Sequence, residues 1–380
     1  MAWKQWSLSQ TRYSSVPADG ISADAELSSI ARCSLPYWRA SKRYRWVVTA
    51  GILTSMFIII HFYIYGDPVQ TATTPLAVTE VDWSRFAYTQ YVTNSAYLCN
   101  SVMFFEALHR IGSRADRVMM YPSTMLQSGD DSSSNARLIF KARDEYNAKL
   151  VPITIQSGHG TDPTWADSFT KLLAFNQTQY SRVLSIDSDS VIFQHMDELF
   201  LLPPSPVAMP RAYWLYPDKQ ILSSQVMLIQ PSEVEFSRIV EKMKVAGQDD
   251  YDMEIVNYLY RDSALILPHR RYDMLTAEFR QDNHAMYLGS DSEVWDPVAA
   301  YNDVKLIHFS DWPISKPWLH TPKELLDELQ PKCSNTTSGT RDCASRDVWN
   351  SVYADFRRRR EEICSLDPKP KRRRQAFERS

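Results

Sequence analysis

Glycine is scarce in this chain, with 10 residues among 380, whereas tryptophan and tyrosine number 11 and 20. No GxGxxG and no GxxxxGK[ST] segment occurs, so a Rossmann or P-loop phosphate-binding loop has no support. The sequence also lacks CxxC, the usual beginning of a structural zinc site. The net charge is only −3, which argues against a dedicated nucleic-acid-binding protein. An apolar content of 44% is that of an ordinary globular protein.

Acidic and basic side chains are absent from residues 47–65, which read VVTAGILTSMFIIIHFYIY. A helix of this length would span about 28 Å, close to the thickness of bilayer hydrocarbon. Residues 39–45 contain four basic residues and no acid, and Asp67 follows the run. The positive-inside rule therefore predicts a type II signal anchor, with a cytosolic N-terminus and a lumenal C-terminal part. The length and flanks disfavour the alternatives, a buried core helix and a cleaved signal peptide.

Charge is distributed unevenly along the chain. Residues 1–46 carry 7 basic and 3 acidic side chains, residues 357–380 carry 10 and 4, and the remainder carries 25 and 38. The acidic middle should repel nucleic acid and suit metal ions or neutral sugars. We predict a disordered cytosolic tail at 1–46, a transmembrane anchor at 47–65 and a stem linker at 66–83. One α/β domain follows at 84–330, and a C-terminal extension with a solvated basic tail at 331–380.

Four of the five cysteines follow the apolar run: Cys99, Cys333, Cys343 and Cys364. They permit three pairings, between which the sequence does not choose. A short Ser/Thr/Gly loop separates Cys333 from Cys343, which makes a disulfide between them plausible. Two Asn-x-Thr sequons, at Asn176 and Asn335, would be usable only in the secretory route.

From residue 86 onward, short apolar runs alternate with helical periods. Strands are predicted at 86–92, 117–121, 150–155 and 182–186, with helices between them at 95–111, 135–149 and 164–176. Further strands are predicted around 207–209, 226–229 and 304–309, and further helices at 232–244 and 252–260. The alternation is typical of βαβ units and predicts an α/β fold with a mostly parallel, doubly wound sheet.

Two acids, Asp187 and Asp189, directly follow the fourth predicted strand. Ligands of open α/β sheets bind beyond the carboxyl ends of the strands. Two carboxylates one residue apart repel each other unless a cation lies between them. Divalent ions such as Mn²⁺ and Mg²⁺ bind carboxylate and phosphate oxygens together. The pattern therefore predicts a metal site, and an acidic turn that caps the next element is the alternative.

Five motifs, in this order and spacing, resemble glycosyltransferase family 8, the glycogenin-like enzymes with a GT-A fold. They cover about residues 86–320. The motifs are YVTNSAY at 91–97, Lys171 with QYSR and DSD at 179–189, SSQ through QPS at 223–232, DME with Asn257 at 252–257, and HF with KPW at 308–318. Lys171 lies 16 residues before the first aspartate, as it does in the family.

The resemblance implies roles for individual residues. Those implied at the uridine and the donor sugar are Thr93, Asn94, Tyr97, Lys171, Ser223, Ser224, Gln225 and Met253. Those implied to carry the chemistry are Asp187, Asp189, Asp252 and Lys316. His308 ends a predicted strand, so a neutral imidazole could complete a Mn²⁺ or Mg²⁺ site with the two aspartates, or could be an ordinary strand histidine. Lys316 could neutralise a diphosphate leaving group or be a solvated loop residue.

Two of the motifs depart from the family pattern at positions that contact the donor sugar. SSQ replaces Asn-Ser-Gly and DME replaces Asp-Gln-Gly, so Gln225 and Glu254 add bulk and hydrogen-bonding groups near the hexose. Met253 offers an apolar surface to an acetyl methyl group, and Gln225 offers a partner for its amide. These changes favour UDP-N-acetylglucosamine as the donor. Within family 8, the chain is most similar to the fungal Golgi α-1,2-N-acetylglucosaminyltransferase group.

The sequence thus predicts a retaining, metal-dependent Golgi glycosyltransferase that moves a sugar from a UDP-sugar to a glycan acceptor. Retention follows from the resemblance. No carboxylate nucleophile is evident, so Asp252 is interpreted as a binder of sugar hydroxyls. Two alternatives stay open: the same scaffold using UDP-glucose or UDP-galactose, and a non-catalytic membrane-anchored protein that binds a nucleotide sugar or a glycan.

Overall fold

The computed structural model describes residues 51, 53–57, 61, 80–126, 133–158, 165–335 and 341–365 of the chain. The predicted cytosolic tail, most of the predicted anchor, nearly all of the linker and the last 15 residues lie outside these ranges. Among the described residues, no helix is both long enough and apolar enough to cross a membrane. A compact unit begins at Glu80.

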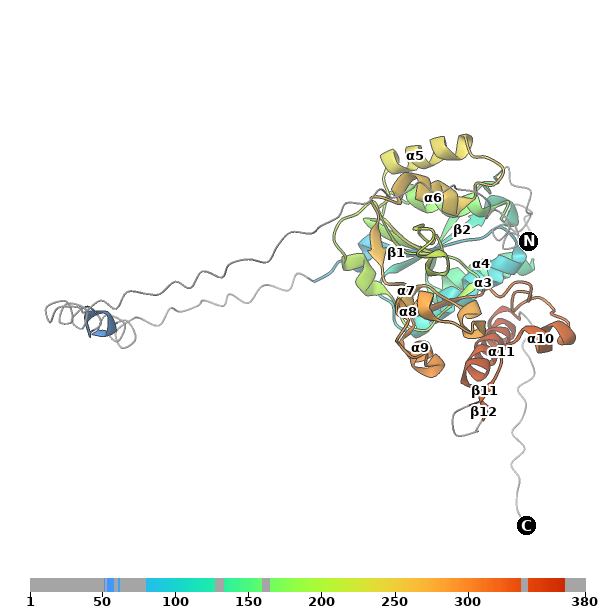
Figure 1. Ribbon diagram of the computed structural model, residues 1–380. Coiled ribbons are helices and arrows are strands. Elements are labelled where there is room, and N and C mark those ends of the chain that lie inside the picture. Colours follow the sequence, from blue (N-terminus) through green and yellow to red (C-terminus); the bar gives the residue numbers. More distant parts are fainter. Residues whose placement is uncertain are drawn as a thin grey trace, which may run out of the picture. The chain divides into compact units, whose positions relative to one another are not determined.

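Seven strands form the main sheet of this unit, in the order β3-β2-β1-β4-β7-β6-β8 (Figure 1). Their bounds are β1 Phe86–Tyr91, β2 Asp116–Pro122, β3 Ala148–Ile153, β4 Arg182–Ile186, β6 Val207–Pro210, β7 Val226–Ile229 and β8 Leu265–Leu267. Neighbouring strands are parallel except at β7, which runs antiparallel to both β4 and β6. The prediction of an α/β fold with a mostly parallel sheet is confirmed.

Successive side chains of the central strands enter two different hydrophobic cores, because strand residues point alternately to the two faces of a sheet. The α3-side core receives Tyr88, Met119 and Leu184 and is covered by α3 Ser95–Arg110, α4 Ser134–Tyr146 and α11 Ala344–Cys364. The α6-side core receives Ala87, Val118 and Val183 and is covered by η3 Ser168–Asn176, α5 Glu233–Lys244 and α6 Asp252–Tyr260. Figure 1 shows α5 and α6 on one side of the sheet and α3 and α4 on the other. Because both faces are covered, apolar residues stand next to one another in these strands instead of alternating with exposed polar ones.

Two predicted helices differ from the observed elements. The helix predicted at 135–149 ends at Tyr146, because Asn147 takes a left-handed conformation with φ 55° and turns the chain into β3. The helix predicted at 164–176 is the 3₁₀ helix η3, and residues 159–164 lie outside the described part.

The strand predicted at 304–309 is β10 Leu306–His308, and it does not belong to the main sheet. It lies between β5 Ser190–Ile192 and β9 Met274–Leu275 in a three-stranded sheet. β10 is antiparallel to β5, with His308 opposite Ser190, and parallel to β9. This small sheet joins the segment after β4 to the chain around residue 308.

The predicted C-terminal extension is partly built into the main unit. Helix α11 buries Trp349, Tyr353 and Phe356 in the α3-side core. Two disulfides are present, Cys99–Cys364 and Cys333–Cys343, and the second is the pairing that the sequence made plausible. The segment Arg357–Arg360, interpreted from the sequence as part of a solvated tail, therefore lies on a packed helix.

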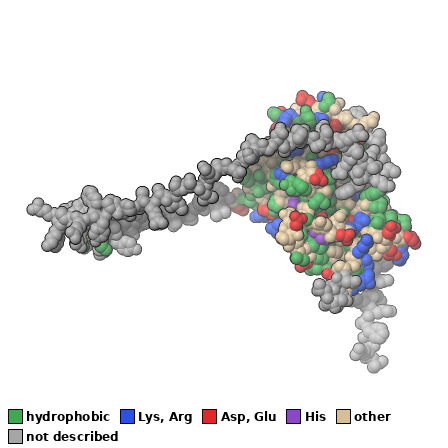
Figure 2. Space-filling view, in the orientation of Figure 1, with side chains coloured by type: hydrophobic (Ala, Val, Ile, Leu, Met, Phe, Trp, Pro, Cys, Tyr) green, Lys and Arg blue, Asp and Glu red, His purple; other side chains and the backbone are tan. Residues whose placement is uncertain are grey.

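Short elements complete the described part of the unit. They are η1 Trp83–Arg85, η2 Ser123–Met125, η4 Asp197–Leu201, η5 Tyr213–Leu215, α7 His269–Tyr272, η6 Thr276–Arg280, α8 Ala285–Leu288, α9 Pro297–Asp303, α10 Lys323–Leu329, β11 Ser334–Asn335 and β12 Arg341–Asp342. On the face shown in Figure 2, basic and acidic side chains are interspersed. Asn176 is exposed at the end of η3, whereas the side chain of Asn335 lies outside the described part.

Candidate active site

The acidic pair lies where β4 leaves the main sheet. Asp187 N donates to Gln225 O at 3.0 Å, which extends the β4–β7 pairing by one residue. Asp189 O accepts from Phe309 N at 3.0 Å, next to the β5–β10 pairing. The two sheets therefore fix the backbone on both sides of the pair. This position is the carboxyl end of a parallel strand, where ligands of α/β sheets bind.

The antiparallel pairing of β5 with β10 brings His308 to the acidic pair. His308 Nε2 lies 3.1 Å from Asp189 Oδ1. One ligand atom from each of Asp187, Asp189 and His308 lies within 4.8 Å of the other two. Two carboxylate oxygens and one imidazole nitrogen form a donor set that fits Mn²⁺ and, less closely, the oxygen-preferring Mg²⁺. The predicted metal ligands thus converge, although 119 residues separate Asp189 from His308 in sequence.

Lys171 is buried between two carboxylates. Its Nζ lies 2.7 Å from Asp187 Oδ1 and 2.6 Å from Asp252 Oδ2, and it also donates to Ser224 O at 3.2 Å. Burial by itself would lower the pKa of Lys171, but Asp187 and Asp252 outweigh it and raise that pKa. Lys171 is therefore a fixed cation that joins the end of β4 to the first turn of α6.

Lys316 pairs with the other aspartate from a loop. Its Nζ lies 2.7 Å from Asp189 Oδ2 and also donates to Phe309 O. Burial favours a higher pKa for Asp189, but His308 and Lys316 outweigh it and hold that pKa well below its usual range. Burial, with the nearby carboxylates, raises the pKa of Asp187 to about 6 despite the opposing charge of Lys171. The two acids therefore differ in electrostatics, and Asp189 is the more firmly ionised.

The predicted uridine residues lie at the start of α3. Asn94 Oδ1 accepts from Ala96 N at 3.0 Å and Tyr97 N at 3.2 Å, so this oxygen caps the helix and the side-chain amide N–H groups are left to donate. The Tyr97 ring stands edge-on to Trp318, with ring centroids 5.6 Å apart. Burial, with Asp189 and Asp187 nearby, raises the pKa of Tyr97, which places its phenol beside the acidic pair. Thr93 is partly buried just before the cap.

The turn before β7 brings the next predicted group beside Asp187. Ser223 and Ser224 are buried, and Ser223 Oγ accepts from Gln225 N at 3.3 Å. Gln225 Oε1 is buried and has no hydrogen-bond partner within the described part of the chain. That oxygen is therefore a buried acceptor left unpaired in the turn next to Asp187.

The first turn of α6 carries the residues that the sequence analysis assigned to the donor sugar, Asp252, Met253 and Glu254. Met253 follows Asp252 and is half-buried. Glu254 was expected near the donor hexose, but its Oε2 accepts from Tyr251 N at 3.1 Å and closes the first helical turn. Glu254 therefore caps the helix, and its place near the donor hexose stays a prediction. Asn257 fixes Leu222, just before the serine turn, through hydrogen bonds of 2.8 Å in both directions.

Asp273 is a buried acid that the sequence analysis missed. It lies directly before β9, it is fully buried, and neither carboxylate oxygen has a hydrogen-bond partner among the described residues. Burial raises its pKa to about 7, although Ser223, His308 and Lys171 act in the opposite direction. Asp273 therefore lies close behind the site. An acid next to the apolar pair Met274 and Leu275 was the signal in the sequence that could have identified it.

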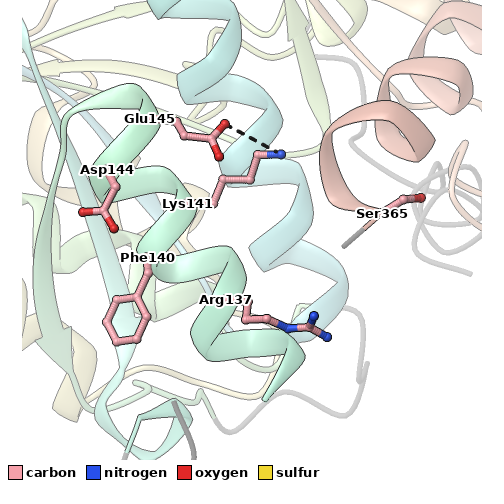
Figure 3. A pocket seen from close by; sticks show the side chains of 6 residues that line it. All are labelled: Arg137, Phe140, Lys141, Asp144, Glu145 and Ser365. Carbon is pink, nitrogen blue, oxygen red and sulfur yellow. Dashed lines mark ion pairs between the residues drawn. The ribbon is translucent and has the colours of Figure 1, made fainter. Parts of the chain in front are cut away.

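Two surface cavities lie elsewhere on the unit. One of about 380 Å³ is bordered by α4 and the end of α11 (Figure 3), and the other, of about 400 Å³, is bordered by α8 and the residues around it. The first is lined by Arg137, Phe140, Lys141, Asp144, Glu145 and Ser365. No predicted site residue lines either cavity.

Comparisons with known proteins give two close relatives. A Gibberella zeae protein named Glucose N-acetyltransferase 1 is 63% identical over 290 residues, which cover 75% of this chain and 63% of that protein. An Aspergillus fumigatus protein of the same name is 45% identical over 363 residues, which cover 91% of this chain and 94% of that protein. Among solved structures, galactosyltransferase LgtC in complex with donor and acceptor sugar analogs gives a TM-score of 0.47 at 12% identity, covering 75% of this chain and 97% of LgtC. No family model matches the chain.

Proposed function

The chain belongs to the family of fungal proteins named Glucose N-acetyltransferase 1 and is a glycosyltransferase, and from this premise we propose that it transfers N-acetylglucosamine from UDP-N-acetylglucosamine to a glycan, with retention of the anomeric configuration. The observation that carries the proposal is the convergence of Asp187, Asp189 and His308 with two lysines at the carboxyl end of β4. This arrangement concentrates ligands for a cation and charges for a diphosphate in one place.

Asp187, Asp189 and His308 would hold a divalent ion, and their donor set suits Mn²⁺. When bound, such an ion supplies Lewis-acid stabilisation to a departing diphosphate. Lys316 lies at the edge of the same cluster and can exchange its contact with Asp189 for one with a diphosphate oxygen. Lys171 is buried and engaged by two carboxylates, so its part is to keep Asp187 and Asp252 in place.

The contacts of Asp252 support the proposal that the anomeric configuration is retained. Its carboxylate is paired with Lys171, its backbone N–H donates to Ser168 Oγ at 3.2 Å, and only 6% of the residue is exposed. A carboxylate held in this way is a well-oriented acceptor for a sugar hydroxyl and a poor nucleophile, because its charge is already neutralised. We therefore propose front-face transfer, in which the acceptor approaches from the side that the nucleotide leaves.

The choice of donor rests on Gln225 and Met253. The free Oε1 of Gln225 can accept from an acetamido N–H, and Met253 offers apolar surface to the methyl group. The names of the relatives agree with a substrate that combines glucose with an N-acetyl group. Both observations favour UDP-N-acetylglucosamine over UDP-glucose and UDP-galactose.

A donor panel tests the proposal. The full-length protein is incubated with Mn²⁺ and each of UDP-N-acetylglucosamine, UDP-glucose and UDP-galactose, and UDP release is measured. We expect release to be fastest with UDP-N-acetylglucosamine and to be lost when the metal is chelated. Faster turnover of UDP-glucose or UDP-galactose would replace the donor, and UDP binding without any turnover would favour a non-catalytic nucleotide-sugar-binding protein.

We also propose that the protein is a Golgi type II membrane protein anchored by residues 47–65. The charge flanks of that segment support this orientation, and so do the two disulfides, because such bonds form and persist in oxidising compartments. The exposed Asn176 sequon is compatible with a lumenal domain. Protease added to intact Golgi vesicles should spare the domain from residue 84 onward, and digestion of that domain would refute the topology.

A further inference from the structure

The loop that carries Lys316 is held by the C-terminal helix. We call residues 309–318 the Lys316 loop. Near its start, Asp311 is buried, and its Oδ2 accepts from Trp349 Nε1 at 3.1 Å and from Tyr353 OH at 2.8 Å. Both donors belong to α11. A buried carboxylate with two such donors fixes the beginning of the loop to this helix.

The end of the Lys316 loop is held by the next turn of α11. Pro317 O accepts from Arg357 Nε at 3.1 Å. The Trp318 ring packs against Phe356, with ring centroids 5.8 Å apart. These contacts flank Lys316 directly on its C-terminal side, so the direction in which its ammonium points depends on α11.

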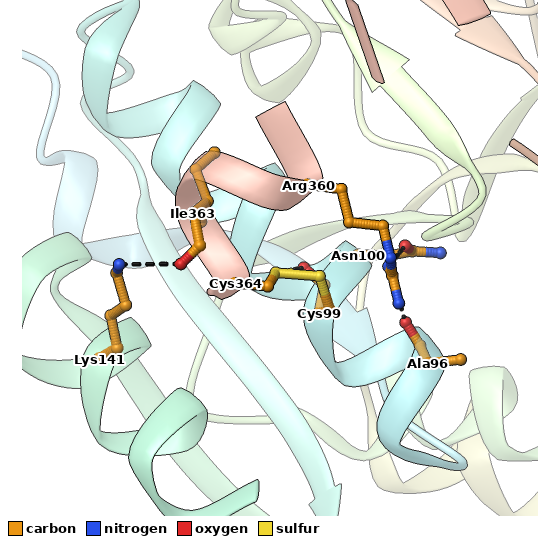
Figure 4. The surroundings of a disulfide bond; sticks show 7 residues. All are labelled: Ala96, Cys99, Asn100, Lys141, Arg360, Ile363 and Cys364. Atoms are coloured by element: carbon orange, nitrogen blue, oxygen red, sulfur yellow. Dashed lines mark hydrogen bonds between the residues drawn. A yellow bond between two sulfur atoms is a disulfide. The ribbon is translucent and has the colours of Figure 1, made fainter. Parts of the chain in front are cut away.

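Arg360 connects the same helix to the start of α3. Its Nη1 donates to Ala96 O at 3.1 Å and to Asn100 Oδ1 (Figure 4). Its guanidinium lies 5.8 Å from the centre of the Trp318 ring. Helix α3 begins with the cap at Asn94 and carries Tyr97, which contacts the other side of this arrangement through Trp318. One guanidinium thus links the start of α3 to Trp318 at the end of the Lys316 loop.

The last turn of α11 is anchored independently of the arginines. Cys364 is bonded to Cys99 of α3, and Lys141 Nζ of α4 donates to Ile363 O at 2.8 Å (Figure 4). These two attachments keep the helix in place when a single arginine is changed. The arginine contacts can therefore be removed without detaching α11.

We propose that Arg357 and Arg360 are positioning residues for donor binding: together they hold the Lys316 loop against α3, so that Lys316 meets the diphosphate while Tyr97 and Trp318 flank the nucleotide. The inference rests on the proposed function, because it assigns the arginines a part in binding the same donor. It also gives a role in the site to the run Arg357–Arg360, which the sequence indicated only as a solvated tail.

Arg358 provides a matched control within the same run. It pairs with Asp355 and Glu362, both on α11, and all three side chains are at least 45% exposed. Replacing Arg358 therefore removes the same charge from the same helix and leaves the Lys316 loop and α3 untouched. Any effect of net charge or of helix stability will appear in this control.

The test measures the affinity of the full-length chain for UDP in the presence of Mn²⁺ by titration calorimetry. We expect Arg357→Ala and Arg360→Ala each to weaken UDP binding about fivefold, the usual effect of losing one well-placed hydrogen bond, and Arg358→Ala to change it less than twofold. Lys316→Ala should weaken binding about tenfold or more. The triple variant with all three changes at 316, 357 and 360 should bind UDP more weakly than Lys316→Ala, but by less than the product of the separate losses, because the arginines act in part through that lysine.

Thermal melting of each variant shows whether a loss of UDP binding is caused by unfolding. If Arg360→Ala does not fold, Arg360→Lys is used in its place. Wild-type UDP affinity in the folded arginine variants, or losses that add fully to that of Lys316→Ala, would overturn the proposal for the arginines alone. Unchanged UDP affinity in Lys316→Ala would count against the proposed function as well, because it would remove Lys316 from the diphosphate.

Discussion

Two lysines hold the acidic pair, and their surroundings differ far more than their distances do. Each Nζ lies 2.7 Å from a carboxylate oxygen, that of Lys171 from Asp187 and that of Lys316 from Asp189. The side chain of Lys171 is 3% exposed and that of Lys316 is 28% exposed. The first comes from a 3₁₀ helix in the α6-side core, and the second from a loop held by α11.

The comparison teaches that an ion-pair distance does not reveal a residue's role. A buried cation between two carboxylates cannot be removed without leaving both unpaired, so Lys171 belongs to the framework of the protein. A partly exposed cation can change partners when a ligand arrives, which is why we propose Lys316 for the reaction. Burial and the element that carries each lysine separate the two roles.

The largest expected effect is on stability and separates the lysines directly. Lys171→Met should lower the free energy of unfolding by about 3–5 kcal/mol, because it leaves buried Asp187 and Asp252 without their shared cation. Lys316→Met should lower it by less than about 1 kcal/mol, as expected for a partly exposed pair. Urea unfolding of the metal-free protein measures the free energy of unfolding of both variants. Equal losses would contradict the assignment of different roles to the two lysines.

The next effect is on turnover, where Lys316 should matter more than it does for stability. Lys316→Ala should lower kcat by about a hundredfold to a thousandfold, the usual loss when one charge that stabilises a leaving group is removed. The melting temperature should stay near that of the wild type. Steady-state assays with the preferred UDP-sugar check the rate, and near wild-type turnover would exclude Lys316 from the chemistry.

A smaller effect concerns donor choice on the Lys171 side. Gln225 is tied to Asp187 through its backbone carbonyl, and its free Oε1 lies in the same turn. Gln225→Gly should reduce the preference for UDP-N-acetylglucosamine over UDP-glucose by roughly thirtyfold at most, the worth of a hydrogen bond with some lost packing. The ratio of kcat/KM for the two donors is the measurement, and an unchanged ratio would remove Gln225 from the sugar pocket.

The smallest effect, taken over one pH unit, is a pH dependence at Asp273, whose pKa Lys171 lowers and Asp187 raises. Its folded pKa of about 7 lies above the ordinary value of 3.8, so the folded protein retains a proton that the unfolded chain has released. Stability should therefore fall as pH rises from about 4 to 7, by about 1.4 kcal/mol per pH unit from this group. Asp273→Asn should remove that contribution in metal-free protein. Parallel stability profiles for the two proteins between pH 6 and 7 would contradict it.

The central sheet and half of the site could be predicted from the sequence. The runs that became β1, β2 and β4 are buried along most of their length because both faces are covered, and each supplies apolar side chains to both cores. The acids after β4 followed from the rule that ligands bind beyond strand ends, and the structure places Asp187 and Asp189 there. Lys171 was found only through the family motif, since a lysine on an apolar helical segment reads equally well as a solvated residue.

The remainder depends on contacts between distant segments. The pairing of β5 with β10 puts His308 opposite Ser190, and nothing within either three-residue strand specifies that partner. Asp273 lies before a strand of two residues, too short for a periodic signal. Arg357 and Arg360 belong to a basic run whose composition is that of a solvated segment, and only the packing of α11 assigns them partners.

The disulfide between Cys99 and Cys364 has a consequence for biosynthesis. Its cysteines are 265 residues apart in sequence. At translation rates of about 5–20 residues per second, Cys99 must wait for tens of seconds as a free thiol before its partner emerges. During that interval Cys333 and Cys343 are made and stand only ten residues apart, so they can pair with each other first. Pairing of Cys364 with Cys99 thus reports that the chain has been synthesised at least as far as the end of α11, so this bond is a covalent mark that both partners of the α3–α11 contact have been made.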